Sequence, residues 1–202
     1  MSNGLFGSPL RYEHFAQDLI ALCDELDFEE VDVMGYSLGG HAALRFAIDA
    51  PDRVRRGVLV SVTHRHDGWF PEVRRNFLTM GRGQFEAFPQ SPLYQTWAAL
   101  APEPERFPEL MDLMGALLAR DYDWSDALST STVPMLVVYA DADAISPSAW
   151  LSFWHLLGGG HHEVGFFSDK RPASQLAVLP GRTHYDVYYD PVLPGMVSAF
   201  LD

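Results

Sequence analysis

The apolar residues of this chain gather in short runs that are separated by stretches with helical spacing. Largely apolar runs occur at Val31–Met34, Val54–Val62, Val133–Tyr139 and Leu176–Leu179. A continuous apolar run of this length is typical of a strand that is buried on both faces, as in a parallel sheet. The pattern therefore predicts a buried strand at each of these positions.

Helical patterns occupy the segments between these runs. From Pro9 to about Asp27, apolar side chains recur at helical spacing and form one face. That face consists of Phe15, Leu19, Leu22, Cys23 and Leu26. Further helices are predicted at Leu38–Asp49, Ser148–Leu157 and Pro191–Leu201. The alternation of strands and helices predicts an α/β fold with a parallel sheet flanked by helices.

Residues 63–128 interrupt this alternation. They are rich in Trp, Phe, Pro and Met, and they show short helical patterns at 72–80, 93–100 and 107–120 but no strand pattern. We interpret the chain as a single domain over residues 1–202, with a helical cap inserted at 65–128. The apolar residues of the cap are expected to lie over a pocket.

Composition and charge exclude several classes of partner. The 202 residues carry a net charge of −13, which argues against binding to nucleic acid or to an anionic membrane. No apolar stretch approaches the length of a membrane-spanning helix, and no signal peptide is recognisable, so a cytoplasmic protein is expected. The single cysteine, Cys23, allows no internal disulfide and is expected to be a small core residue.

A G-x-S-x-G motif, Gly35-Tyr36-Ser37-Leu38-Gly39, lies between the first predicted strand and the following helix. A serine on a sharp strand-to-helix turn exposes its hydroxyl, and the small residues around it let strand and helix approach closely. The Leu38 N–H at the start of the helix could bind a developing oxyanion. The pentapeptide alone fits a plain turn equally well.

Two later loops follow predicted strands and carry groups that could activate this serine. Asp141 and Asp143 follow the strand that ends at Tyr139, and His184 follows the last strand. Functional residues of open parallel sheets gather beyond the carboxyl ends of the strands. A nucleophilic serine needs an imidazole to accept its proton and a carboxylate to orient that imidazole. Ser37, Asp143 (or Asp141) and His184 are therefore the candidate catalytic residues.

The chain resembles the α/β-hydrolase superfamily of serine esterases. The matching stretches are D-V-M-G-Y-S-L-G-G at 32–40, D-A-D-A-I-S-P at 141–147 and L-P-G-R-T-H-Y-D at 179–186. The resemblance implies Ser37 as nucleophile, His184 as base and the later acid, Asp143, as the third member. It implies a small-molecule ester-like substrate. Because the sequence contains no G-x-G-x-x-G or Walker motif, we predict no nucleotide cofactor.

The resemblance also predicts hydrolysis of a carboxylic ester, lactone or thioester through an acyl-enzyme. Two alternatives remain open at this stage. One is a C–C hydrolase or perhydrolase that uses the same three residues. The other is a catalytically impaired remnant that acts as an interaction module, because the family's usual H-G loop, which supplies a second oxyanion donor, is not found ahead of the motif.

The strands that normally precede the motif in this family are also not recognisable, so we expect an N-terminally truncated sheet. The strand Val31–Met34 would then lack a neighbour on one side, although Asp32 places one charge at that edge. An unpaired apolar edge is a template for another chain. We therefore expect a homo-oligomer, most simply a two-fold dimer.

A second cluster, His64, His66 and Asp67, could be read as metal ligands. Two histidines and one acid with no third histidine nearby are too few for a catalytic metal site. We interpret the segment as a polar loop, and we predict no metal.

Overall fold

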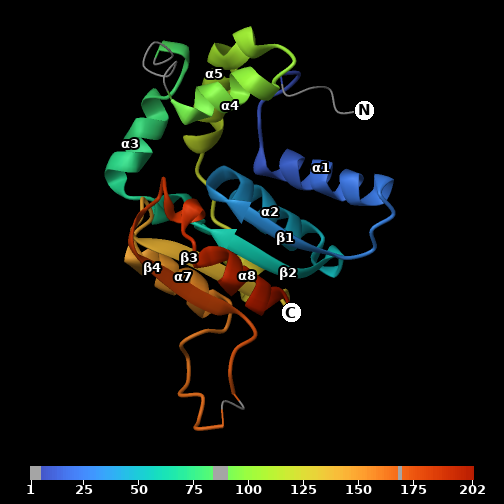
Figure 1. Ribbon diagram of the computed structural model, residues 1–202, viewed down its shortest axis with the longest axis vertical. Helices are drawn as coiled ribbons and strands as arrows, with labels where there is room; N and C mark the ends of the chain where they lie inside the picture. Colours follow the sequence, from blue (N-terminus) through green and yellow to red (C-terminus); the bar gives the residue numbers. More distant parts are fainter. Residues whose placement is uncertain (1–5, 84–90, 168–169) are drawn as a thin grey trace. The chain divides into compact units, whose positions relative to one another are not determined.

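The computed structural model describes residues 6–83, 91–167 and 170–202 (Figure 1). Its contacts divide the chain into two compact units. The helical unit comprises Met1–Arg11 and Pro71–Asp121, and the sheet unit comprises Tyr12–Phe70 and Tyr122–Asp202. The chain therefore leaves the sheet unit after Phe70 and re-enters it at Tyr122.

The sheet unit is built on a four-stranded parallel sheet in the order β1-β2-β3-β4. Its strands are β1 (Val31–Tyr36), β2 (Val54–Val60), β3 (Met135–Ala142) and β4 (Gln175–Thr183). The α/β class and the parallel sheet predicted from the apolar runs are confirmed. The last strand is longer than predicted, because it continues beyond Leu179 until Thr183 pairs with Ala142 of β3.

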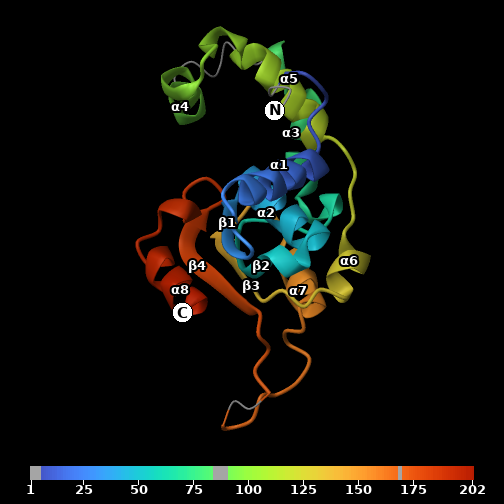
Figure 2. The ribbon, with the colours of Figure 1, turned by 90° about the vertical axis from the view of Figure 1, so that its right-hand side faces the viewer.

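Helices cover both faces of this sheet. The sheet unit contains α1 (Tyr12–Glu25), α2 (Ser37–Asp49), α6 (Ser125–Ser129), α7 (Pro147–Leu156) and α8 (Leu193–Leu201). Short 3-10 turns occur at Pro51–Arg53, His66–Gly68 and Val187–Tyr189. Figure 2 shows α8 on one side of the strands and α7 on the other.

Alternate residues of the central strands supply the two halves of the core. On one face, Val58, Val60, Leu136 and Val138 pack with Leu193 and Phe200 of α8. On the other face, the ring of Tyr139 stacks on Trp150 of α7, with ring centroids 5.0 Å apart. Because both faces are buried along residues 57–60 of β2 and residues 135–140 of β3, these stretches carry no charged side chain, which produces the continuous runs seen in the sequence.

The helical unit contains α3 (Pro71–Thr79), α4 (Pro92–Leu100), a 3-10 turn at Pro104–Arg106 and α5 (Phe107–Leu118). These helices fall within two residues of those predicted. Phe107, Leu110 and Met111 form a small core, against which Phe6 and Trp97 pack. Whether this segment covers a pocket remains a prediction.

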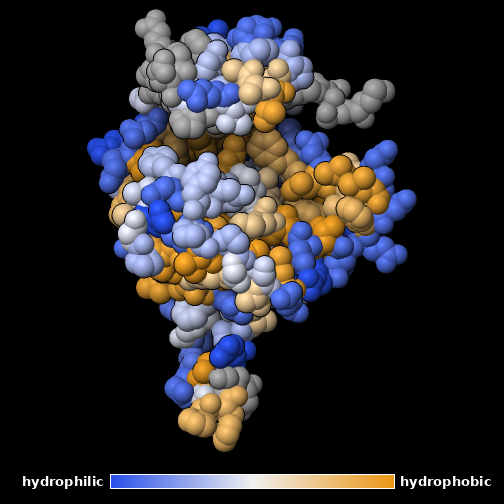
Figure 3. All heavy atoms as spheres, viewed as in Figure 1, coloured by the Kyte–Doolittle hydropathy of each residue, from blue (hydrophilic) through white to orange (hydrophobic). Residues whose placement is uncertain are grey.

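The sheet unit leaves apolar surface open at the outer edge of β1. In the parts of the chain that the structure describes, β1 pairs with β2 alone. Beside this edge, Leu22 of α1 and Leu26 just after α1 are about half exposed (53% and 50%). Figure 3 shows this apolar surface over α1.

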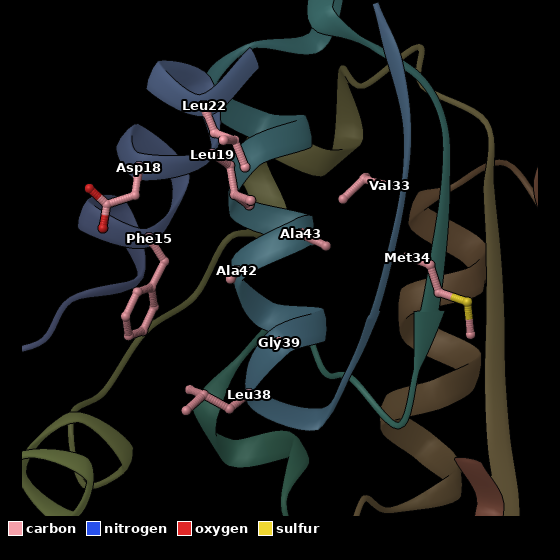
Figure 4. Close-up of a pocket in the computed structure, with 10 residues that line it drawn as sticks. All are labelled: Phe15, Asp18, Leu19, Leu22, Val33, Met34, Leu38, Gly39, Ala42 and Ala43. Atoms are coloured by element: carbon pink, nitrogen blue, oxygen red, sulfur yellow. The ribbon is translucent and has the colours of Figure 1, made fainter. Parts of the chain in front are cut away.

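A groove of about 470 Å³ runs between α1, α2 and β1 beside that edge (Figure 4). Its walls are mainly apolar and include Leu19 and Leu22 of α1, Val33 of β1, and Leu38 of α2. Among the helices that the structure describes, none is both long and apolar enough to cross a membrane.

Candidate active site

Ser37 occupies the sharp turn between β1 and α2. Its φ of +49° lies in the left-handed region, which a residue with a side chain rarely adopts. Gly35 permits the close approach of strand and helix, because a Cβ there would overlap the backbone of Gly39. This strained turn presents the serine at the carboxyl end of β1, as the motif predicted.

The second close contact of the turn belongs to Gly40. A Cβ at Gly40 would overlap the side chain of Val62, whereas a Cβ at Gly39 would meet nothing within 4 Å. We expected the small residue two positions after Ser37, Gly39, to be the one that the turn requires. That expectation was wrong, because Gly39 faces the open groove of Figure 4.

Ser37, His184 and Asp143 form one hydrogen-bonded chain. The Oγ of Ser37 lies 2.9 Å from Nε2 of His184. The Nδ1 of the same ring lies 3.0 Å from Oδ1 of Asp143. These residues come from the carboxyl ends of β1, β4 and β3, and both His184 and Asp143 are buried.

The carboxylate of Asp143 is held from several sides. Its Oδ2 accepts a 2.6 Å hydrogen bond from the Ser61 hydroxyl and a 3.1 Å bond from the Ala140 N–H. Its Oδ1 also accepts the Ile145 N–H at 3.3 Å. These donors fix the plane of the carboxylate, so Oδ1 stays aimed at His184.

Asp141 lies elsewhere. Its carboxylate accepts the backbone N–H groups of Gly181 and Arg182 at 3.0 and 3.2 Å. The Gly181 N–H is the main cause that lowers the pKa of this exposed acid. Asp141 therefore makes hydrogen bonds within the loops, and Asp143 is the acid that reaches His184.

Tyr36 has a contact that the motif did not reveal. Its hydroxyl donates a 2.6 Å hydrogen bond to the backbone carbonyl of His184, and the two rings lie 5.5 Å apart. Burial, followed by the nearby Asp143 charge, raises the pKa of Tyr36 to about 12, so the hydroxyl stays protonated. Tyr36 thus links the turn that carries Ser37 to the loop that carries His184.

The segment around His64 differs from its prediction as a polar loop. His64 is fully buried and packs on Phe153 with ring centroids 5.2 Å apart, and His66 is also buried. Burial is the main cause that lowers the pKa of His64 to about 4. Within the described ranges, no group of three or more His, Cys, Asp or Glu side chains could hold a metal ion.

Comparison with known proteins defines the class of this chain. The pattern of the α/β hydrolase fold matches residues 6–158, which is most of the sequence. The chain therefore belongs to the α/β hydrolase fold family. An esterase from Thermogutta terrifontis has a similar fold, with a TM-score of 0.63, 21% identity, and coverage of 96% of this chain and 73% of that one.

Two curated relatives match parts of the sequence. A putative carbamate hydrolase from Caulobacter vibrioides is 38% identical over 73 residues, which are 35% of this chain and 26% of that protein. A 2-hydroxy-6-oxononadienedioate/2-hydroxy-6-oxononatrienedioate hydrolase from Paraburkholderia xenovorans is 46% identical over 50 residues, which are 25% of this chain and 17% of that protein. The matches thus span about a quarter or less of these relatives.

Proposed function

We propose that this chain is a serine hydrolase that cleaves a carboxylic ester, lactone or thioester through an acyl-enzyme. The observation that carries the proposal is the continuous hydrogen-bonded chain from Ser37 Oγ through the His184 ring to Asp143. Both relatives are named as hydrolases, which supports hydrolysis as the type of reaction. Their particular substrates are not carried over to this chain. The net charge of −13 supports a small-molecule substrate over nucleic acid.

In this proposal His184 acts first as base and then as acid. The Asp143 carboxylate accepts the Nδ1–H, which leaves the Nε2 lone pair directed at the Ser37 hydroxyl. Ser37 Oγ attacks the substrate carbonyl while its proton passes to Nε2. The protonated His184 then gives that proton to the leaving alcohol or thiol, and the acyl-serine ester remains.

Hydrolysis of the acyl-enzyme repeats these steps with water. His184 takes a proton from water, the hydroxide oxygen attacks the acyl carbon, and the proton returns to Ser37 as the acid is released. The Leu38 N–H, at the start of α2, is proposed to donate to the oxyanion in both halves. These steps use side chains, backbone and water, so we propose no cofactor.

Two alternatives are retained. A C–C hydrolase or perhydrolase would use the same three residues, and the match to the hydrolase from Paraburkholderia xenovorans favours testing a 2-hydroxy-6-oxo dienoate. An interaction module without catalysis is the second. It would keep the fold but show no reaction that depends on Ser37.

A fluorophosphonate probe tests the proposal directly, because it labels only an activated serine. Wild type should be labelled and Ser37→Ala should not. Short p-nitrophenyl esters should be hydrolysed by wild type alone. Labelling of both proteins or of neither removes Ser37 as the nucleophile, and identical ester hydrolysis by both supports the interaction module.

A further inference from the structure

A second chain of hydrogen bonds begins at Ser37 and runs inward from its backbone carbonyl. Nδ1 of His41 lies 2.8 Å from that carbonyl oxygen, and Nε2 of the same ring lies 2.9 Å from the Tyr122 hydroxyl. The Tyr122 oxygen in turn lies 3.2 Å from Nε1 of Trp69. All four residues belong to the sheet unit.

The chemistry at the two ends fixes the direction of every bond. A carbonyl oxygen only accepts, so His41 carries its proton on Nδ1, and Nε2 is left as an acceptor. Tyr122 therefore donates to Nε2, and its oxygen accepts the indole N–H of Trp69, which only donates. The carbonyl of Thr63, at 3.5 Å from the Tyr122 oxygen, is the more distant acceptor for the same hydroxyl proton.

The surroundings keep His41 neutral and fixed. Its side chain is fully buried, and burial lowers its pKa to about 4. The ring stacks on Trp69 at 5.8 Å with an angle of 20° between the planes, and Tyr12 packs on it at 5.4 Å. A neutral imidazole is the form that can accept from Tyr122 while donating to Ser37.

Trp69 also contacts His184 and the loop that carries Asp143. Its ring packs edge-on to the ring of His184, with centroids 5.3 Å apart. Its backbone forms a bridge with Ile145, the residue whose N–H donates to Asp143. Trp69 thus lies between the histidine and the acid loop, and its indole N–H leads back to Ser37.

We propose that His41, Tyr122 and Trp69 are positioning residues that hold the left-handed Ser37 turn and the His184 ring in alignment. The inference rests on the proposed function. The additional hydrogen bond on the Ser37 carbonyl restrains a peptide that is strained at φ +49°. Trp69, fixed through Tyr122, supports one side of the His184 ring.

A simple packing role would predict a different result, and Tyr139 provides the matched control. Tyr139 is also a buried tyrosine, and its hydroxyl donates to the Val62 carbonyl at 2.7 Å. Tyr122→Phe and Tyr139→Phe each remove one buried hydroxyl and keep the ring. Both should lower the Tm, but only Tyr122→Phe should lower kcat, by about 10- to 100-fold with KM within about twofold, because catalysis is sensitive to small misplacements.

Substitutions at His41 divide the network at its centre. In His41→Asn the amide N–H can replace Nδ1–H at Ser37 while the link to Tyr122 is lost. His41→Asn should have the same kcat as Tyr122→Phe, and the double variant should have no lower kcat than either single variant. Equal loss of kcat in Tyr122→Phe and Tyr139→Phe, or wild-type kcat in Tyr122→Phe, overturns the proposal.

NMR of the histidine rings separates this inference from the proposed function. At pH 7 the ¹⁵N shifts of wild type should identify His41 as the Nδ1–H tautomer. Tyr122→Phe should move the His184 ring resonances, whereas Tyr139→Phe should leave them in place. Unmoved His184 resonances in Tyr122→Phe overturn the positioning role, while an unlabelled Ser37 in wild type rejects only the hydrolase.

Discussion

Ser61 and Asp143 are joined by a 2.6 Å hydrogen bond from the serine hydroxyl to Oδ2 of the carboxylate. Ser61 directly follows β2 and has a φ of +53°, close to that of Ser37 at the end of β1. Adjacent parallel strands thus end in two strained serines. Ser37 faces His184, and Ser61 donates a hydrogen bond to Asp143.

Removing the Ser61 hydroxyl should loosen the acid. A hydrogen bond to a charged group is worth about 1.5–3 kcal/mol, so Ser61→Ala and Ser61→Gly should each lower kcat about tenfold. The two variants differ in backbone strain, because alanine at a positive φ costs about 1–2 kcal/mol relative to glycine. Ser61→Gly should therefore unfold at a higher temperature than Ser61→Ala, and unchanged kcat in both would contradict this role.

Gly40 and Gly39 are neighbours in the first turn of α2 and provide a matched pair of variants. Gly40→Ala places a methyl group against Val62 and should destabilise the fold by about 1–3 kcal/mol. Gly39→Ala meets open space and gains helix propensity, so its stability should equal or exceed that of wild type. Urea denaturation of both variants measures the difference, and equal midpoints would show that the tight contact is misplaced.

Stability should fall with acid because His41 is buried in its neutral form. Its pKa is about 4 in the folded state and about 6.5 in the unfolded chain, so the unfolded state binds more protons between these values. The contribution of His41 to the free energy of unfolding is thus complete above pH 6.5. It is lost as the pH falls towards 4, by up to about 3 kcal/mol. His64, with the same lowered pKa, adds to this loss.

Urea denaturation at pH 7.5 and pH 4.5 measures the effect. His41→Gln removes one titrating group and should reduce the difference between the two pH values. Exposed His162 serves as the control, since His162→Gln should leave that difference unchanged. A pH dependence that is the same in wild type and His41→Gln would contradict the assignment.

The β1 edge should bind a second copy of the chain. An open strand edge offers N–H and C=O groups that another strand edge can pair, and two copies can do so antiparallel about a two-fold axis. Such pairing would place Met34, 40% exposed, near its symmetry mate. Light scattering should show a dimer that Met34→Lys weakens and that Val192→Lys, just before α8, does not. A stable wild-type monomer at micromolar concentration would contradict the expectation.

The sequence predicted those parts of the site that are encoded in short contiguous stretches. Ser37, Asp143 and His184 each sit in a loop that follows an apolar run, and parallel strands bring such loops together without further information. Tyr122 could not be found in this way. Its partner His41 is 81 residues away, and neither residue has a local pattern that marks it.

Burial was harder to predict than the elements themselves, for a physical reason. Helical spacing places Leu19 and Leu22 on one face of α1, but spacing does not tell whether a neighbour covers that face. Likewise, the segment with His64 was interpreted as a polar loop, although packing against Phe153 places His64 in the core. Burial depends on the tertiary neighbours, which composition does not specify.

The two points at which the chain leaves and re-enters the sheet unit are fastened to each other. His66 donates its N–H to the Tyr122 carbonyl at 2.8 Å, and Trp124 donates to the His64 carbonyl at 2.9 Å. These two backbone hydrogen bonds join the start and the end of the insertion, and they do not depend on which residues the insertion contains. Different insertions could therefore be grafted between Phe70 and Tyr122, over the course of evolution or by design, while the Ser37 turn and its inner network stay intact.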